Sequence, residues 1–225
     1  MKLNLLSIGT NAKTSKSDKL HPEYLTAILY LSPGAPSICP FAEKAGCKAA
    51  CLNTAGRGKL SNVQLARQRK TKLWLEDRPQ FLKLLNDDII KVIKYCDKNR
   101  RKACFRLNGT SDIQWERHIQ MEDYSEAQFY DYTKLPKSRK LPINYHLTFS
   151  YSGATPEYGA RSLANGMSTS VVFRNGPFPK FFLGYPVFNG DSHDLRFLDP
   201  PGHVIGLSAK GRAKHDYSGF VVDVI

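Results

Sequence analysis

The chain has 225 residues, of which 41% are hydrophobic and 11% aromatic. This is enough for one sizeable core and excludes a disordered chain. Its formal net charge is +13 at pH 7, so we expect a nucleic acid or nucleotide as partner, with a basic surface lacking a specific partner as the alternative. We find no transmembrane run and no secretion signal, so we expect a cytoplasmic protein with no membrane partner.

In chain order, residues 1–22 are polar and predict an extended N-terminal arm or a lead-in strand. Residues 26–32 form a continuous apolar run, which is typical of a strand buried on both faces. Pro33 and Gly34 end this run. A loop with three of the five cysteines follows directly.

Two helices are predicted after this loop. Ser61 is a candidate N-cap with Gln64 as its capping-box partner, and the first helix should end near Glu76. Pro79 fits the first position of the second helix. An apolar residue recurs at every fourth position of that helix, which indicates a face packed on the core: Phe81, Leu85, Ile89 and Ile93. Cys96, near the end of that helix, is expected to be a small buried residue.

The rest of the chain alternates short strands with helical or loop segments. Strands are predicted over residues 103–108, 129–133, 144–151, 169–174 and 204–208, with a further candidate over 183–188 and a helix around 161–166. We therefore predict a single domain over residues 1–225. Its fold class should be α/β, a partial (β/α) barrel with a largely parallel sheet and helices outside. The segment 135–142 is short for a helical crossover.

The three clustered cysteines are Cys39, Cys47 and Cys51. In a reducing compartment, an odd cysteine count with such a cluster favours metal binding over disulfides. Three thiolates can hold three irons of a [4Fe–4S] cluster or make three of the four bonds of a tetrahedral zinc ion. Cys104 is a candidate fourth ligand, which would favour zinc; without it, a cluster would have one open iron.

Polar residues gather just after the predicted strands, where the functional groups of parallel α/β sheets lie. A cofactor or substrate pocket is predicted from Asn108, Ser111, Asp112, Thr148 and Ser150. Asp112 is equally well explained as a helix cap.

A second polar group follows later in the chain. Asp191 and Asp194 are candidate ligands for a divalent cation, and His193 for a ligand or proton shuttle. A polar turn explains the same residues equally well. Lys210, after the last strand, is a candidate contact for a phosphate or carboxylate, with a solvated lysine as the alternative.

Several segments resemble the gene-product-eighty-eight-like proteins of bacteriophages. They are residues 38–58 around the cysteines, 108–116 (Asn-Gly-Thr-Ser-Asp-Ile-Gln-Trp-Glu), 132–134 (Tyr-Thr-Lys) and 190–199 (Gly-Asp-Ser-His-Asp-Leu-Arg-Phe-Leu-Asp). The resemblance covers most of the chain and implies a phage origin, hence the host cell cytoplasm. It implies no particular activity.

A more distant resemblance is to radical S-adenosylmethionine enzymes. These place three cysteines on the loop after the first strand of a partial (β/α) barrel, and the fourth iron binds S-adenosylmethionine. Cys39, Cys47 and Cys51 hold the same place in the order of elements. The family spacing is Cys-x3-Cys-x2-Cys, whereas here it is Cys-x7-Cys-x3-Cys, and no Gly-Gly-Glu segment follows.

The leading hypothesis is therefore an iron–sulfur protein that acts as a radical-type enzyme on nucleic acid or a nucleotide. One alternative is a magnesium-dependent nuclease with metals on Asp112, Asp191 and Asp194 near Lys210, and the cysteines as a structural zinc site. The other is a nucleic-acid-binding module with structural zinc and no activity.

Overall fold

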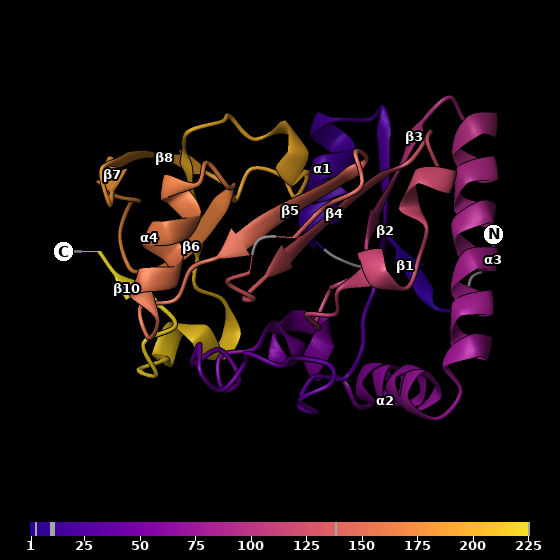
Figure 1. Cartoon of the computed structure of the whole chain (residues 1–225), viewed down its shortest axis with the longest axis horizontal. Helices are drawn as coiled ribbons and strands as arrows, with labels where there is room; N and C mark the ends of the chain where they lie inside the picture. Colours follow the sequence, from indigo (N-terminus) through magenta and orange to yellow (C-terminus); the bar gives the residue numbers. More distant parts are fainter. Residues whose placement is uncertain (3, 10–11, 138, 225) are drawn as a thin grey trace.

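A computed structural model describes residues 1–2, 4–9, 12–137 and 139–224 of the chain. In these residues the centre is a ten-stranded sheet in the order β1-β2-β3-β4-β5-β6-β9-β8-β7, with β10 beside β6 (Figure 1). The strands are β1 (Leu6–Ile8), β2 (Tyr24–Leu29), β3 (Lys102–Arg106), β4 (Gln128–Thr133), β5 (Tyr145–Ser150), β6 (Thr169–Arg174), β7 (Phe181–Phe182), β8 (Tyr185–Asn189), β9 (Val204–Ser208) and β10 (Val222–Asp223).

The sheet is mostly parallel. Strands β2 to β6 are neighbours in sequence order, and β9 and β8 continue the parallel run beyond β6. Only β1 against β2 and β7 against β8 pair antiparallel among the described strands. The α/β class with a largely parallel sheet is thus confirmed. The sheet is open, with β1 and β7 at its two ends, and does not close into a barrel.

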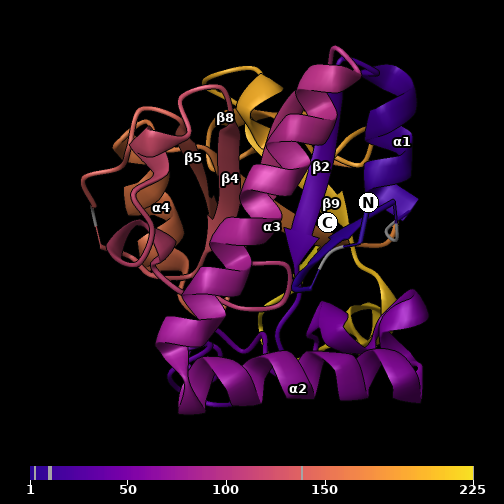
Figure 2. The same ribbon diagram turned by 90° about the vertical axis from the view of Figure 1, so that its right-hand side faces the viewer.

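Helices α2 (Ser61–Glu76) and α3 (Arg78–Lys98) follow the loop after β2. Helix α3 lies along the sheet and α2 crosses one end of it (Figure 2). Asp77 caps α3, because its Oδ1 accepts the N–H of Gln80 at 3.0 Å. The predicted apolar stripe of α3 is buried in the main core with alternate residues of β2, β3, β4 and β5. The fourth helix, α4 (Pro156–Ala164), contacts β5 and β6.

The opposite face of the sheet is covered by helix α1 (Ala12–Leu20) and by residues 190–199. Arg106 on β3 forms an ion pair with Asp194 at 3.0 Å, and the hydroxyl of Tyr130 donates to the same carboxylate at 3.2 Å. The N–H of Asp194 donates to Ser17 Oγ on α1 at 2.8 Å. Helices therefore lie on both faces of the open sheet, whereas the predicted partial barrel would carry them on its outer face alone.

The N-terminal segment is more structured than predicted. Strand β1 pairs with β2, as the lead-in-strand alternative predicted, whereas helix α1 follows where the other alternative expected an extended arm; residues 3, 10 and 11 of that segment lie outside the described part. The buried carboxylate of Asp88 on α3 accepts main-chain N–H groups of Asn4, Leu5 and Leu6 at 2.7–3.1 Å. These bonds fix the start of the chain to α3.

The other predicted elements are confirmed with small shifts of their ends. Helix α2 has the predicted bounds, but Leu60 and not Ser61 is its N-cap. Gln64 does not complete a capping box. Its side chain instead donates to the carbonyl oxygens of Asn53, at 2.8 Å, and Gly58. The parallel strands β4 and β5 are joined by a segment in which the described residues form no helix. No helix in the described ranges is both long and apolar enough to cross a membrane.

Candidate metal centre at the carboxyl edge of the sheet

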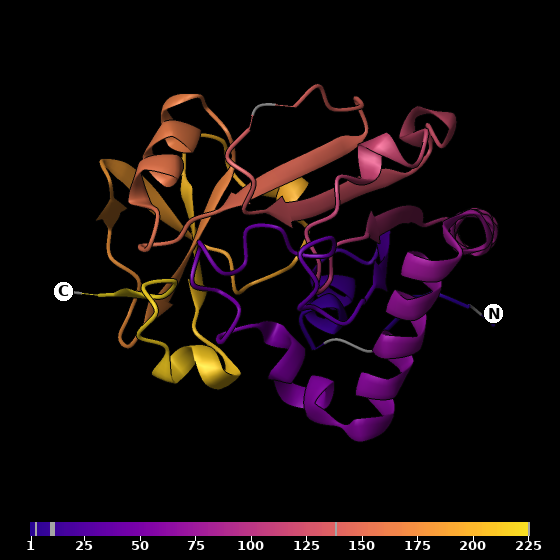
Figure 3. The ribbon, with the colours of Figure 1, turned by 60° about the horizontal axis from the view of Figure 1, so that its bottom comes forward.

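The cysteine loop, residues 33–60, lies beside the C-terminal segment of the chain (Figures 1 and 3). Three hydrogen bonds fix it to parts of the chain that follow strands or precede β10. The Asp112 N–H donates to Ile38 O at 2.8 Å, Ser152 Oγ to Ala45 O at 2.7 Å, and Ser218 Oγ to Gly46 O at 2.6 Å. Because Asp112 and Ser152 follow the ends of β3 and β5, the loop lies along the carboxyl edge of the sheet.

Gly46 is needed at the closest of these contacts. Its φ is +67°, a conformation that L side chains rarely adopt. A Cβ at this position would also lie 2.7 Å from Ser218 Oγ. The glycine therefore allows the loop to turn tightly just before Cys47.

The three thiols of this loop are half-buried and form no disulfide. Cys39 Sγ lies 3.9 Å from the Thr110 carbonyl oxygen, and Cys51 Sγ accepts the Asn53 N–H at 3.5 Å. Burial is the largest of the effects that raise the pKa of Cys39 to about 12, and the nearby Cys51, Asp112 and Cys47 contribute to the same rise. The thiols are therefore close enough for the charge on one to affect the others.

The three thiols do not surround a common point in this structure. In the described part of the chain, no three or more His, Cys, Asp or Glu side chains form a group that could hold a metal ion. The Cys47 thiol faces the Ala42 carbonyl oxygen at 3.7 Å, and the other two thiols also contact main-chain groups. Binding of a shared ion would replace these contacts and release the thiol protons.

Two cations flank the thiols. Lys134, just after β4, donates through Nζ to the carbonyl oxygens of Ser150 and Tyr151 at 2.8 and 2.9 Å. Burial lowers the pKa of Lys134 to about 8, although nearby Cys47 and Asp112 raise it. Near Cys51, Arg67 of α2 is buried and lies over the ring of Tyr30, 4.8 Å from its centroid. Both positive charges favour the thiolate form that metals require.

Neither Arg67 nor Lys134 was among the predicted site residues, although Lys134 lies in the 132–134 motif. Lys134 carried a usable signal, because it directly follows a predicted strand, as Asp112 nearly does. Arg67 carried no such signal. It lies on a polar helix among other basic residues, and two of these, Arg69 and Lys72, are exposed as basic helix residues usually are.

Asp112 belongs to the same site. Its carboxyl group is buried, and Oδ2 accepts the Lys134 N–H at 2.7 Å. Burial raises the pKa of Asp112, while the hydrogen bond from the Lys134 N–H and the nearby Thr133 side chain lower it. Its charge in turn raises the pKa of both Cys39 and Cys47. Asp112 thus lies beside the thiols, as part of the same group.

Asn108 and Ser111 organise the loop that carries Asp112. Asn108 Oδ1 accepts hydrogen bonds from Ser111 Oγ, the Ile113 N–H and Trp115 Nε1 at 2.8–3.0 Å. Its Nδ2 donates to the Ile113 carbonyl oxygen at 2.9 Å. The side chain predicted to line a pocket is therefore engaged in holding residues 108–115 in place.

Thr148 and Ser150, the other two residues predicted to line a pocket, have different surroundings. Thr148 is fully buried within β5, with its hydroxyl 3.3 Å from that of Ser168, so it belongs to the interior of the sheet. Ser150 ends β5 and contributes its carbonyl oxygen to Lys134. Only Ser150 is connected to the cysteine site.

The carboxylates predicted for a nuclease have separate partners. Asp191 accepts the Ser208 N–H at 2.9 Å and pairs with the exposed Lys210 at 3.0 Å. Although burial alone would raise it, these two partners hold the pKa of Asp191 below its usual value. Asp194 is paired with Arg106 on the far face of the sheet. The structure therefore does not gather Asp112, Asp191 and Asp194 into one site.

His193 lies with the second group, away from the thiols. Its Nε2 is 3.7 Å from the Asp199 carboxylate, and its ring meets that of His21 edge-on, with centroids 5.1 Å apart. Cys104, the suggested fourth ligand, is fully buried in the middle of β3, where it packs with Tyr130 and Leu195 on the face of the sheet opposite α3. It therefore belongs to the hydrophobic packing of that face. Cys96 is buried as predicted.

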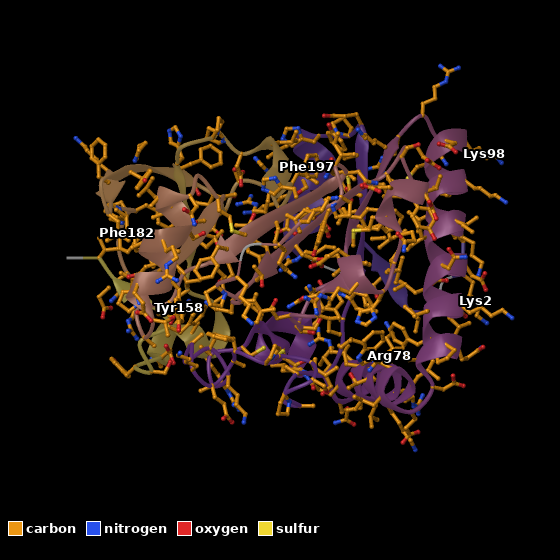
Figure 4. The ribbon with its side chains drawn as sticks, viewed as in Figure 1. Lys2, Arg78, Lys98, Tyr158, Phe182 and Phe197 are labelled. Atoms are coloured by element: carbon orange, nitrogen blue, oxygen red, sulfur yellow. The ribbon has the colours of Figure 1, made fainter. Side chains whose placement is uncertain are left out.

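The basic residues do not form one surface. Residues 98–102 lie at the turn between α3 and β3, and Figure 4 shows Lys98 at the opposite end of α3 from Arg78. Around the cysteine loop, a different set of exposed cations forms what we call the basic rim: Lys44, Lys48, Arg57, Lys59, Arg212 and Lys214. Its two halves meet where Gly211 approaches Ala55, with 3.1 Å between the Ala55 Cβ and a Cβ built on the glycine. Within this set, Lys48 is paired with Glu43 and Lys44 donates to the Tyr158 hydroxyl.

Fold and site together define an open, mostly parallel α/β protein with a cysteine-rich loop over the carboxyl edge of its sheet. A family model described as Gene product 88 matches residues 4–224. The chain therefore belongs to the Gene product 88 family, as its bacteriophage-like motifs indicated. Searches of curated proteins and of solved structures found no match.

Proposed function

We propose that Cys39, Cys47 and Cys51 hold an iron–sulfur cluster and that the protein is a cluster-dependent, radical-type enzyme acting on nucleic acid or a nucleotide. The observation that carries this proposal is that three half-buried thiols share the loop after the first parallel strand, and that a buried carboxyl group after β3 and two cations, one after β4 and one on α2, lie beside that loop. The donor set fits, because thiolate sulfur is the protein ligand of such clusters.

The surroundings of the thiols also suit a cluster of negative charge. Lys134 lies on the side of Cys47 and Arg67 on the side of Cys51. Hydrogen bonds and nearby charge are the levers by which a protein sets the properties of an iron–sulfur centre. With S-adenosylmethionine bound, a cluster of this kind supplies one-electron chemistry.

The substrate would bind at the edge of the sheet and not on its face. The face opposite α3 is filled by buried side chains, including Arg106, Tyr130 and Arg196. The basic rim borders the cysteine loop, and lysine and arginine there would contact phosphates without reading sequence. A nucleic acid lying on this rim would come close to the cysteine site.

The test is anaerobic reconstitution with iron and sulfide, followed by incubation with S-adenosylmethionine and dithionite. We expect 5′-deoxyadenosine from the native chain and none from a Cys39→Ser, Cys47→Ser, Cys51→Ser triple variant. A Cys96→Ser variant is the matched control and should retain the activity. A reconstituted cluster that never cleaves S-adenosylmethionine would contradict the enzyme assignment.

A second candidate is a nucleic-acid-binding module stabilised by zinc on the same cysteines. It is favoured by the position of the loop. Hydrogen bonds tie the loop to segments after β3 and β5 and before β10, so an ion that orders the loop would also stabilise the packing of these segments. It predicts one tightly held zinc per chain, unfolding on chelation and salt-dependent binding to DNA or RNA. A colourless native protein with that behaviour would replace the enzyme proposal.

A further inference from the structure

One carboxyl oxygen of Asp112 is buried but has no hydrogen-bond partner in the described part of the chain. The residue is 8% exposed, and Oδ2 is used by the Lys134 N–H. Oδ1 is buried and accepts no hydrogen bond from any residue in the described ranges. Such an atom in a folded protein needs an explanation, and an ion that the site binds is one of them.

The position of Asp112 is fixed relative to the cysteine loop. Its main-chain N–H donates to the carbonyl oxygen of Ile38, the residue before Cys39. Two residues earlier, the Thr110 carbonyl oxygen is the group that Cys39 Sγ contacts. Two contacts thus hold residues 110–112 beside the first cysteine.

The neighbouring cation does not use the free oxygen. Lys134 Nζ is directed to the carbonyl oxygens of Ser150 and Tyr151, and only its main-chain N–H reaches the Asp112 carboxyl group. The carboxylate charge acts on the thiols of Cys39 and Cys47. Oδ1 is therefore the carboxyl atom that these contacts leave unused, on a residue that the main chain holds beside Cys39.

We propose that Asp112 is the fourth protein ligand of the ion or cluster held by Cys39, Cys47 and Cys51, and that it binds through Oδ1. This rests on the proposed function only in requiring that the three thiols hold metal. Three sulfur donors and one carboxylate oxygen complete a tetrahedral zinc site or close the fourth iron of a cubane. In a cluster, S-adenosylmethionine would then have to displace the Asp112 carboxylate.

The experiment is X-ray absorption spectroscopy of the zinc-loaded protein, together with an anaerobic Co²⁺ titration. We expect three sulfur donors and one oxygen donor around zinc in the native chain, and four sulfur donors in Asp112→Cys. The sulfur-to-cobalt charge-transfer band should grow by about one third in Asp112→Cys, because its intensity follows the number of thiolates. Asp112→Asn should weaken Co²⁺ binding by at least about tenfold.

Asp191→Asn is the matched control, because Asp191 follows a strand of the same sheet but pairs with Lys210. It should leave spectrum and affinity unchanged. Three sulfur donors in both the native chain and Asp112→Cys would overturn the assignment of Asp112 while leaving the cysteine site standing. Absence of Co²⁺ and zinc binding in the native chain would overturn both.

Discussion

Replacing Asp194 with Asn leaves the Arg106 guanidinium without its carboxylate partner inside the fold. The two side chains are almost completely buried and lie 3.0 Å apart, and Tyr130 donates to the same carboxylate. Removing one member of a buried ion pair costs about 3–5 kcal/mol, because the remaining charge stays desolvated. For a chain of this length, that corresponds to a fall in melting temperature of roughly 6–20 °C.

The assay is thermal unfolding of the native chain, Asp194→Asn and a double variant, Arg106→Met with Asp194→Leu. The double variant removes both charges together, so it should recover most of the lost stability. Metal content of the cysteine loop should be the same in all three folded proteins. If Asp194→Asn keeps the native melting temperature but loses activity, Asp194 is a catalytic residue and the structural interpretation is refuted.

Burial raises the pKa of Asp131 to about 7, although the Asn108 N–H and the Tyr145 hydroxyl donate to its carboxyl group. The folded state therefore holds a proton that the unfolded state releases between roughly pH 4 and 7, so stability falls as pH rises through this window, by at most ~4 kcal/mol. Urea unfolding at pH 5 and pH 8 should show a flatter dependence for Asp131→Asn than for the native chain; equal slopes would contradict this. Cys104→Ala should retain full metal content, measured by elemental analysis, because Cys104 packs with Tyr130 and Leu195 in the middle of β3; loss of metal in a folded variant would contradict this.

Much of the fold was predictable because it depends on local pattern. The four-residue stripe of α3 and the apolar runs of the parallel strands identify elements that bury one or both faces. The rule that chemistry collects after parallel strands also drew attention to Asp112, which lies beside the cysteine loop. Strand geometry places Cys104 roughly 13 Å before Asn108, within the strand and away from the carboxyl edge, which agrees with its buried position.

Other features depend on partners far away in the chain. Asp191 and Asp194 are three residues apart, yet one pairs with Lys210 and the other with Arg106. No local pattern shows that the turn between them separates their side chains. The burial of Arg67 likewise depends on Tyr30 and the cysteine loop, whereas an arginine on a polar helix is ordinarily exposed.

The central claim is that the cysteine loop binds an iron–sulfur cluster. The most direct measurement is the iron and acid-labile sulfide content of anaerobically purified protein, with its visible absorbance. We expect brown protein with about four irons and matching sulfide per chain, lost when Cys39, Cys47 or Cys51 is replaced by Ala. Colourless protein without iron, or full iron and sulfide in the three alanine variants, would contradict the claim.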